Sequence, residues 1–334
     1  MSHPQLRVGI VGAGGITQAH VPGWQSIGAE VAVWSKGGAD RLAAQYGLRE
    51  AQSFEELVAS VDLIDICTPT ATHLDYANAA LKAGVPVISE KPVSLDPDAA
   101  RETGRLAAER GLGLYPAHVV RYFPEYVAAK RAIDAGDIGR PAVMRFQRIG
   151  ECPAWAPWYG DLKQSGGIIV DQMIHDIDAA RWFAGEVVEV YATRVADVER
   201  HIVTAQVVLT HESGTISYLN GVWGAKGLTF RTVFSVAGDA GLLTFDSRDA
   251  ASVHLDTGSA ATSESYLPDP GLGESPYTLE LIDFLGAIRG EHDARVTWDD
   301  GIRAAEIALA ANESVVAGAP VRLSPALRST GVAR

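Results

Sequence analysis

The chain has 334 residues, more than the roughly 250–300 at which a single hydrophobic core usually stops growing, so two domains are expected. Its formal net charge of −13 excludes nucleic acid as the main partner, because phosphate binding needs clustered Lys and Arg. The two cysteines, Cys67 and Cys152, are too far apart for a zinc motif or a disulfide framework, so a reduced, cytoplasmic protein is expected. No apolar stretch reaches the ~18 residues of a membrane span, and no leader is expected.

The first third of the chain alternates short apolar runs with helical stretches. The expected strands are 6–14, 29–35, 61–69, 86–92 and 112–119, and the expected helices include 39–47, 73–84 and 98–111. Strands that alternate with helices form βαβ units, which build a parallel sheet covered by helices on both faces. The sequence therefore predicts an N-terminal Rossmann domain over residues 1–121, of the doubly wound α/β class.

A second pattern begins after a helix expected at 124–139. Closely spaced strands are expected at 141–150, 186–195, 201–210, 214–223, 229–238 and 241–247, followed by helices at 277–290 and 298–318. Strands joined by short turns favour antiparallel pairing. Residues 122–334 are thus predicted to form an α+β domain with a large, mainly antiparallel open sheet.

Three glycines, Gly12, Gly14 and Gly15, stand between the first expected strand and the helix that follows it. Glycines in this position allow a tight turn and a close approach of the backbone to a pyrophosphate at a helix N-terminus. Thr17 stands where the usual motif has its third glycine. An ordinary strand–helix turn is the alternative, but the place of this turn at the start of a βαβ series favours a nucleotide site.

The end of the second expected strand indicates which nucleotide binds. NAD-binding proteins usually carry an acidic residue there to hold the ribose 2′-hydroxyl, whereas this chain has Ser35 and Lys36 and no carboxylate before Asp40. A hydroxyl and an ammonium suit a 2′-phosphate. NADP is therefore expected as the cofactor, with NAD the less favoured choice; a solvated loop lysine is the alternative explanation for Lys36.

Several spaced motifs together resemble the Gfo/Idh/MocA family of nicotinamide-dependent sugar and polyol oxidoreductases. They are "VDLIDICTPTATH", "AGVPVISEKPVSL", "HVVRYFPEY", "IDAGDIGRP", "SGGIIVDQMIHDIDAARWFAG", "ELIDFLGAIRG" and "GIRAAEIALAANESVVAGAPVRL", in that order along nearly the whole chain. The resemblance implies cofactor-binding roles for Gly12, Gly14, Gly15, Ile16, Thr68, Pro69, His73 and Glu90. It also implies that Lys91 is the active-site lysine and that Asp171 and His175 complete the catalytic group. Thr17 and Ser35 depart from the pattern of the family.

The segment "DQMIHDID" (171–178) contains three aspartates and one histidine. On one continuous helix, Asp171, His175 and Asp178 share a stripe, Asp176 lies off it, and Val170, Met173, Ile174, Ile177 and Ala180 form an apolar stripe. A carboxylate neighbour raises the pKa of a histidine and fixes its tautomer, as a general base requires. A core histidine and a metal site are alternatives, but a catalytic zinc usually takes three protein ligands, so metal-free chemistry is favoured.

Two further features are assigned to the substrate. The loop 151–164 carries Trp155, Trp158 and Tyr159, whose rings suit a sugar ring, although a structural surface loop is equally compatible with this composition. Arg121 matches an arginine at the junction of the domains in that family, where it would contact substrate or brace the domains. Asp178 would touch substrate or buttress His175.

The sequence as a whole predicts an NADP-dependent oxidoreductase that moves a hydride between nicotinamide and a CH–OH or C=O carbon of a sugar, polyol or related cyclic alcohol. Lys91 would polarise the oxygen. His175 would move the proton, and Asp171 would orient His175 or the substrate. A redox-assisted glycoside hydrolase that uses NAD and a non-catalytic nucleotide sensor are the alternatives. The resemblance also implies a homodimer or homotetramer formed through the second sheet.

Overall fold

The computed structural model describes residues 5–153, 156–197, 199–249 and 274–324. The chain divides into two compact units, one of residues 1–127, 161–165 and 262–302, the other of residues 128–160, 166–261 and 303–334. This division differs from a single boundary after residue 121, because the first unit extends to 127 and also contains α10 (Pro276–Ile288). Leu281, Phe284 and Leu285 of α10 pack into the hydrophobic core of the first unit, and this burial explains why so distant a segment belongs there.

The first unit is built on a six-stranded sheet in which every pairing is parallel. Its strands are β1 (Arg7–Val11), β2 (Glu30–Trp34), β3 (Arg49–Glu50), β4 (Leu63–Ile66), β5 (Val87–Glu90) and β6 (Leu114–Ala117). Their spatial order is β3-β2-β1-β4-β5-β6, so the direction of winding reverses between β1 and β4. This is the Rossmann arrangement that the alternation of strands and helices predicts.

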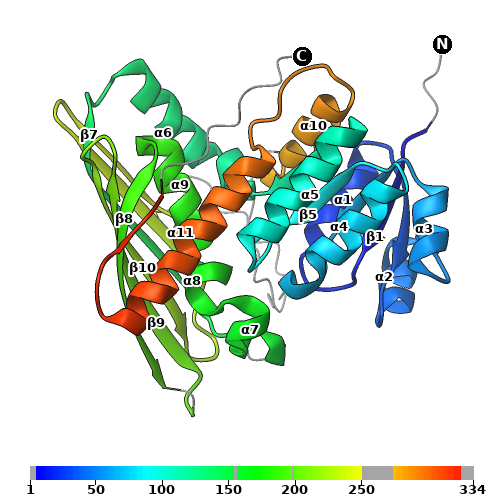
Figure 1. Cartoon of the computed structure of the whole chain (residues 1–334), viewed down its shortest axis with the longest axis horizontal. Helices are drawn as coiled ribbons and strands as arrows, with labels where there is room; N and C mark the ends of the chain where they lie inside the picture. Colours follow the sequence, from blue (N-terminus) through cyan, green and yellow to red (C-terminus); the bar gives the residue numbers. More distant parts are fainter. Residues whose placement is uncertain (1–4, 154–155, 198, 250–273, 325–334) are drawn as a thin grey trace. The chain divides into compact units, whose positions relative to one another are not determined.

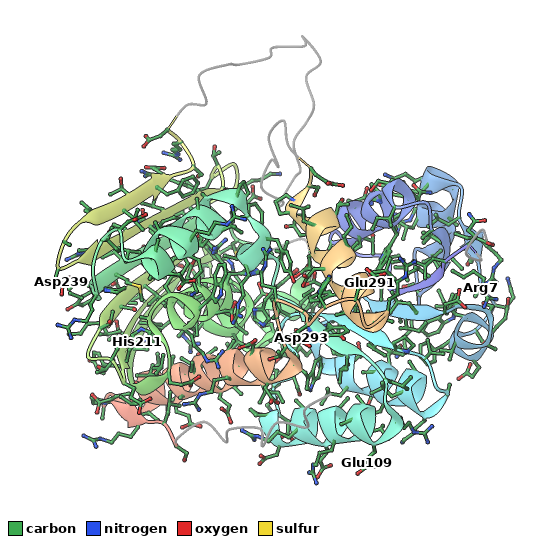
Figure 2. All side chains as sticks on the ribbon, turned by 90° about the horizontal axis from the view of Figure 1, so that it is seen from above. Arg7, Glu109, His211, Asp239, Glu291 and Asp293 are labelled. Atoms are coloured by element: carbon green, nitrogen blue, oxygen red, sulfur yellow. The ribbon has the colours of Figure 1, made fainter. Side chains whose placement is uncertain are left out.

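Helices connect these strands, and local sequence signals define where several of them begin. They are α1 (Thr17–Ser26), α2 (Ala39–Tyr46), α3 (Phe54–Ser60), η1 (Thr70–Thr72), α4 (His73–Lys82), α5 (Pro97–Arg110), η2 (Val119–Tyr122) and α7 (Leu162–Ser165). The Ser53 side chain caps α3, and Asp96 caps α5, whose first residue is Pro97. These residues satisfy amide groups that have no partner inside the helix. The outer face of α5 is solvated, as Glu109 illustrates in Figure 2.

The second unit is built on a seven-stranded sheet of order β12-β11-β7-β10-β9-β8-β13. Its strands are β7 (Pro141–Glu151), β8 (Val187–Asp197), β9 (Ile202–His211), β10 (Ile216–Gly224), β11 (Arg231–Gly238), β12 (Leu242–Asp246) and β13 (Val321–Arg322). Only β7 and β10 pair in parallel, so the prediction of a mainly antiparallel sheet is confirmed.

Helices cover one face of this second sheet (Figure 1). They are α8 (Gly167–Asp171) and α9 (Ile174–Ala184), joined by the C-terminal part of α11 (Trp298–Ala317); η3 (Pro157–Gly160) precedes them, and α6 (Pro124–Ala135) leads into β7. The approach is close, because a Cβ added at Gly221 of β10 would lie 2.5 Å from the Cγ of Met173. Within the described residues, no helix is both long enough and apolar enough to cross a bilayer.

Candidate active site

The residues expected to bind the cofactor follow neighbouring strands of the first sheet. Gly12 follows β1, Ser35 follows β2, Thr68 comes two residues after β4, and Lys91 follows β5. In an open parallel sheet, the carboxyl ends of all strands meet at one edge, and ligands bind there at the point where the winding reverses. That point lies between β1 and β4 in this chain. The fold thus gathers at one edge residues that are up to about 80 positions apart in the sequence.

The glycines of the first turn differ in what surrounds them. Gly12 has a φ of +116°, and an added Cβ would lie 2.4 Å from the carbonyl oxygen of Cys67, so this glycine is needed for the packing of β1 beside β4. An added Cβ at Gly14 would reach only that same oxygen, at 4.0 Å, and one at Gly15 would meet nothing within 4 Å. Gly14 and Gly15 therefore leave open space in front of α1, which fits a pyrophosphate at a helix N-terminus.

Thr17 keeps the turn compact without the third glycine. Its side chain is buried, and its hydroxyl donates a hydrogen bond of 2.6 Å to the Gly14 carbonyl. The threonine thus fixes the turn through its own side chain, and the departure from the usual glycine pattern has a structural explanation.

The loop after β2 carries the residues that were expected to favour NADP. The Ser35 hydroxyl donates to the Gly37 carbonyl at 2.9 Å, and Lys36 is exposed. A cation that the sequence analysis did not single out lies beside them: the Arg41 guanidinium is 3.4 Å from where a Cβ on Gly38 would be. The loop therefore carries two cationic side chains, whereas the Ser35 hydroxyl is engaged within the loop itself. The signal in the sequence was the position of Arg41 in the first turn of the following helix.

His73 is buried, and both ring nitrogens face backbone carbonyls. Nδ1 lies 2.8 Å from the oxygen of Pro92, and Nε2 lies 2.8 Å from the oxygen of Thr68. Burial lowers the pKa of His73, although the two carbonyls oppose this effect. The histidine connects the turn after β4 with the turn after β5, and it thereby braces the segment around Lys91. Its expected place along the cofactor stays a prediction.

Glu90 and Lys91 form the end of β5. The Glu90 side chain is buried, its Oε2 accepts a hydrogen bond of 3.1 Å from the Lys91 backbone amide, and Lys91 itself is partly exposed. The Lys91–Pro92 peptide bond is cis. Sequence reasoning missed what holds Glu90 from its other side, which is His20 of α1 at 3.1 Å. One feature of the sequence does point to buried polar side chains here. Asp65 is a charged residue inside the otherwise apolar strand β4, and such a residue needs a buried partner.

In the second unit, the segment 171–178 is not one continuous helix, and this corrects the expected stripe. Asp171 ends α8, Gln172 and Met173 form a turn, and His175 lies in the first turn of α9. His175 and Asp178 still share a face of α9, but Asp171 belongs to the separate helix α8 and is not part of that face. The interruption coincides with the burial of Met173 against Gly221. The apolar stripe is confirmed, since all five of its residues are buried.

Asp176 occupies a buried ion pair, which the helical pattern did not predict. Its carboxylate accepts two hydrogen bonds from the Arg148 guanidinium of β7, at 3.1 Å from Nε and 2.7 Å from Nη2. The Gln172 amide donates to the Arg148 carbonyl at 2.9 Å. These bonds attach the start of α9 to β7 on both sides of His175. Asp178 is also fully buried, while His175 is only half-buried.

The residues assigned to the substrate have different surroundings. Trp158 and Tyr159 stack at a centroid distance of 3.9 Å, and Tyr159 meets Trp223 of β10 edge-on at 6.3 Å; Trp155 lies outside the described residues. Arg121 is 3% exposed and pairs with Asp300 within the first unit at 3.4 Å. That pair joins two segments of one unit, so both expected roles of Arg121, at the substrate and between the domains, stay predictions.

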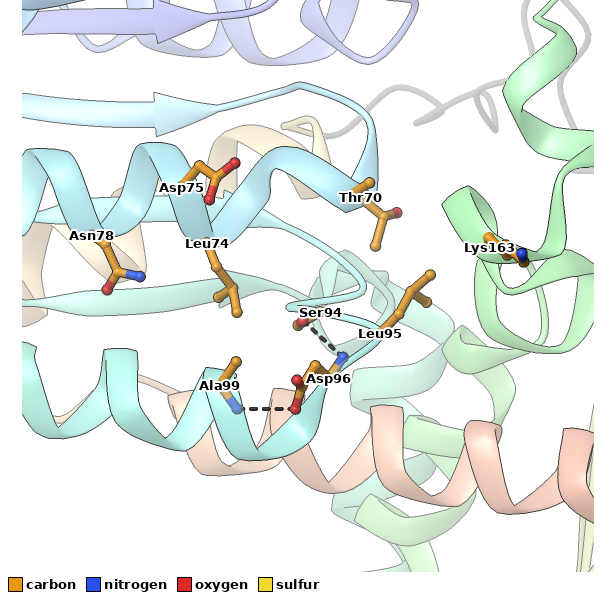
Figure 3. Close-up of a pocket in the computed structure, with 10 residues that line it drawn as sticks. Thr70, Leu74, Asp75, Asn78, Ser94, Leu95, Asp96, Ala99 and Lys163 are labelled. Carbon is orange, nitrogen blue, oxygen red and sulfur yellow. Dashed lines mark hydrogen bonds between the residues drawn. The ribbon is translucent and has the colours of Figure 1, made fainter.

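A cavity of about 430 Å³ opens beside the N-terminal ends of α4 and α5 (Figure 3). It is lined by Thr70, Ala71, Leu74, Asp75, Asn78, Ser94, Leu95, Asp96, Ala99 and Lys163. The residues predicted to bind cofactor or to catalyse are not among these lining residues. Thr70 and Ala71 of this lining nevertheless directly follow Pro69, one of the residues predicted to bind cofactor.

Two family models match the chain. Residues 6–118 match the model of an oxidoreductase family with an NAD-binding Rossmann fold, and residues 126–244 match the GFO/IDH/MocA C-terminal domain. An inositol 2-dehydrogenase of Rhizobium meliloti is 29% identical over 326 residues, which are 93% of this chain and 97% of that protein.

Solved structures agree with this match. A myo-inositol dehydrogenase of Corynebacterium glutamicum has a TM-score of 0.79 and 27% identity, over 97% of this chain and 100% of that one. The scyllo-inositol dehydrogenase of Lactobacillus casei with bound NAD(H) and scyllo-inositol has a TM-score of 0.78 and 25% identity, over 96% and 99%. The chain belongs to the Gfo/Idh/MocA family of oxidoreductases.

Proposed function

We propose that the protein is an NADP-dependent dehydrogenase that transfers a hydride between nicotinamide and a CH–OH or C=O carbon of a cyclic polyol or sugar. The observation that carries the proposal is the set of residues at the carboxyl edge of the first sheet, where open glycines precede α1 and Lys91 follows β5. The inositol dehydrogenases among its relatives support the choice of substrate class. Bound nicotinamide would supply the hydride acceptor or donor.

The side chains of the protein would handle the oxygen and the proton. The Lys91 ammonium would stabilise the negative charge that develops on the substrate oxygen. His175, half-buried at the start of α9, would accept the hydroxyl proton in oxidation and return it in reduction. Asp171 would orient the histidine or the substrate, and Asp178 would support His175 from the same face of α9.

The Lactobacillus casei relative was solved with NAD(H), so it does not support a preference for NADP. That preference is argued from residues of this chain alone. Ser35 and Lys36 directly follow β2, and the Arg41 guanidinium lies beside the same loop. The two cations attract a 2′-phosphate, whereas the carboxylate that usually holds the ribose of NAD is missing at this strand end.

Two measurements test the proposal. NADPH and NADH are titrated against the protein by fluorescence, and the preferred nucleotide is then used to screen inositols, other polyols and cyclic sugars for turnover. We expect NADPH to bind at least about tenfold more tightly than NADH, a difference of about 1.4 kcal/mol. Binding of NADH alone would overturn the NADP assignment. Glycoside cleavage without added nucleotide would replace the dehydrogenase by the hydrolytic alternative.

A further inference from the structure

A buried group of ionisable side chains lies behind the end of β5, within the first unit. His20 and Trp24 come from α1, Asp65 from β4, Glu90 from β5 and Glu280 from α10. His20, Trp24, Asp65 and Glu280 are fully buried. Charged side chains are rarely buried unless they are paired, so such a group requires an explanation.

Hydrogen bonds join four of these side chains, those of Trp24, Asp65, His20 and Glu90, into a chain that ends at Lys91. The Trp24 indole donates to Asp65 Oδ2 at 2.7 Å, and His20 Nδ1 lies 2.8 Å from the same oxygen. On the other side of the ring, His20 Nε2 lies 3.1 Å from Glu90 Oε1. Glu90 Oε2 accepts from the Lys91 backbone amide at 3.1 Å.

The partners of His20 determine its charge. Each ring nitrogen faces a carboxylate oxygen, and an ionised carboxylate only accepts, so both nitrogens must carry a proton. Burial is the largest single influence and lowers the pKa of His20, but the charge of Asp65, the interaction with Cys67 and the hydrogen bonds to both residues together raise the pKa well above its ordinary value. The imidazolium therefore neutralises part of the charge of the two carboxylates between which it lies.

Two further ionisable side chains, Cys67 and Glu280, lie close to His20. Burial raises the pKa of the Cys67 thiol to about 12, so it is neutral. Burial and the charge of Glu90 raise the pKa of Glu280 well above its ordinary range, so that carboxyl is protonated. Tyr277 contributes a ring at 6.3 Å. His20 is thus a cation that α1 places against Glu90.

A metal site is a poor explanation for the same residues. His20, Asp65 and Cys67 offer ligand atoms within 4.8 Å of one another. However, His20 Nδ1 and Asp65 Oδ2 are in direct hydrogen-bond contact at 2.8 Å, and Trp24 donates to that same oxygen. Ligands that each lie ~2.0–2.3 Å from a tetrahedral zinc are farther apart than this. The group is arranged as a hydrogen-bonded network.

We infer that His20, in its charged form, is a positioning residue for Lys91: it holds the Glu90 carboxylate, which in turn holds the backbone turn that bears the lysine. His73 restrains the same turn from the other side through the Pro92 carbonyl. The inference rests on the proposed function only in naming Lys91 as catalytic. A displacement of about 1 Å in such a group can lower a rate ~10²-fold, so the buried network acts on catalysis without touching substrate.

The first readout is the accessibility of Lys91, which needs neither cofactor nor substrate. The whole protein is labelled with trace acetic anhydride at pH 8, and peptide mass spectrometry gives the acetylation rate of Lys91 relative to the exposed Lys82. In His20→Gln, which cannot bridge two carboxylates with separate nitrogens, we expect this ratio to rise at least threefold. His211→Gln is the matched control, because His211 is a buried, doubly hydrogen-bonded histidine of the second unit. Its ratio is expected to stay within twofold of the wild type.

A double substitution distinguishes two roles of His20: positioning Lys91 through Glu90, or only filling space in the core. In the double variant His20→Gln/Glu90→Gln, the new side-chain oxygen at position 90 can accept from the Lys91 amide, and the new side-chain NH₂ there can donate to the glutamine at position 20. This pair leaves no charge without a partner between the two positions. We expect the acetylation ratio to return to within twofold of the wild type. This variant also carries the test if His20→Gln alone does not fold. A ratio in the double variant that stays raised would overturn the inference, as would an unchanged ratio in a folded His20→Gln.

The second readout uses turnover once a substrate is identified. For His20→Gln we expect kcat to fall at least tenfold, while KM and the Kd of NADPH change less than threefold. A parallel loss of cofactor binding would indicate a general structural role and would overturn the inference. If no polyol is turned over but the acetylation ratio responds as expected, the proposed function fails and the positioning of Lys91 by His20 stands.

Discussion

Individual glycines of the first turn have separable roles, because their surroundings differ. Gly12 has a positive φ and would bring a Cβ within 2.4 Å of the Cys67 carbonyl, whereas Gly15 faces open space. We expect Gly12→Ala to lower the free energy of unfolding by about 2–4 kcal/mol, from backbone strain and a steric clash. Gly15→Ala should change stability by less than about 1 kcal/mol and should weaken NADPH binding at least tenfold. Urea unfolding and nucleotide titration on both variants check this pair, and equal stability losses would contradict it.

The proposed catalytic residues are expected to affect the rate more than the binding. Lys91→Met removes the charge that would stabilise the developing alkoxide, and His175→Ala removes the proton acceptor. Each should lower kcat ~10²–10⁴-fold, with the Kd of NADPH changed less than about threefold for His175→Ala. Steady-state kinetics on a substrate found by the screen give the result. Unchanged turnover in both variants would refute the proposed mechanism.

At the scale of elements, the buried pair Arg148–Asp176 is expected to hold α9 against β7. Asp176→Ala leaves the Arg148 charge buried without its partner, so a loss of about 3–5 kcal/mol in the free energy of unfolding is expected. The exposed pair Arg7–Asp62 is the control, since solvent screens its charges and Asp62→Ala should have a much smaller effect (Arg7 is labelled in Figure 2). Chemical denaturation of both variants measures their free energies of unfolding. Comparable losses in the two variants would contradict the claim that burial makes the Arg148–Asp176 pair the more important one.

The helix α10 brings into the first unit a carboxyl group that makes stability depend on pH. Both oxygens of Glu280 are buried and have no hydrogen-bond partner among the described residues, and burial raises the pKa of this group well above 4.5. Above the unfolded pKa, the folded state therefore holds a proton that the unfolded chain has lost. The free energy of unfolding then falls by about 1.4 kcal/mol per pH unit until the folded pKa is reached.

Replacement of the Glu280 carboxyl should remove its contribution to the pH dependence of the free energy of unfolding. Glu280→Gln is expected to stabilise the protein at pH 7–8 and to have little effect near pH 4, where the wild-type carboxyl is protonated in both states. Urea unfolding at several pH values measures the difference, with Glu291→Gln as a surface control that removes the same formal charge (Figure 2). A stabilisation that is equal at pH 4 and pH 8 would contradict the titration of Glu280.

At the scale of the whole molecule, we propose that the face of the second sheet opposite its helices forms a homo-oligomer interface. Several apolar side chains on its strands are exposed, including Tyr191, Val195 and Tyr218. Val208 pairs with Tyr218 across the β9–β10 ladder. Large apolar areas are usually covered by a partner.

A charge on that face should disrupt the assembly. Val208→Glu is expected to reduce the mass in solution to that of a monomer, measured by light scattering, because a buried interface does not tolerate an unpaired carboxylate. Val316→Glu on α11 is the control, since Val316 is 87% exposed and lies on a helix. A wild-type protein that is already monomeric would contradict the proposed interface.

Much of this architecture could be predicted from the sequence, because its signals are local. The alternation of apolar runs and helices predicts the parallel sheet, and β7 to β12 begin within two residues of the predicted positions. The glycine turn, Ser35 and Lys91 fall at strand ends, where their short-range patterns predict them. These features depend on side-chain periodicity and turn chemistry, which a few neighbouring residues decide.

The remaining features depend on residues far apart in the chain, and only the tertiary structure decided them. The turn between α8 and α9 coincides with the packing of Met173 on Gly221, and the burial of Asp176 follows from Arg148 on another strand. His20 faces Glu90 across 70 positions. A prediction from helical periodicity places a charged residue in solvent, because the periodicity contains no information about a counter-charge that is distant in the sequence. The sequence by itself thus determined the two sheets and the edge that carries Lys91, whereas packing decided which charges are buried and what holds that lysine.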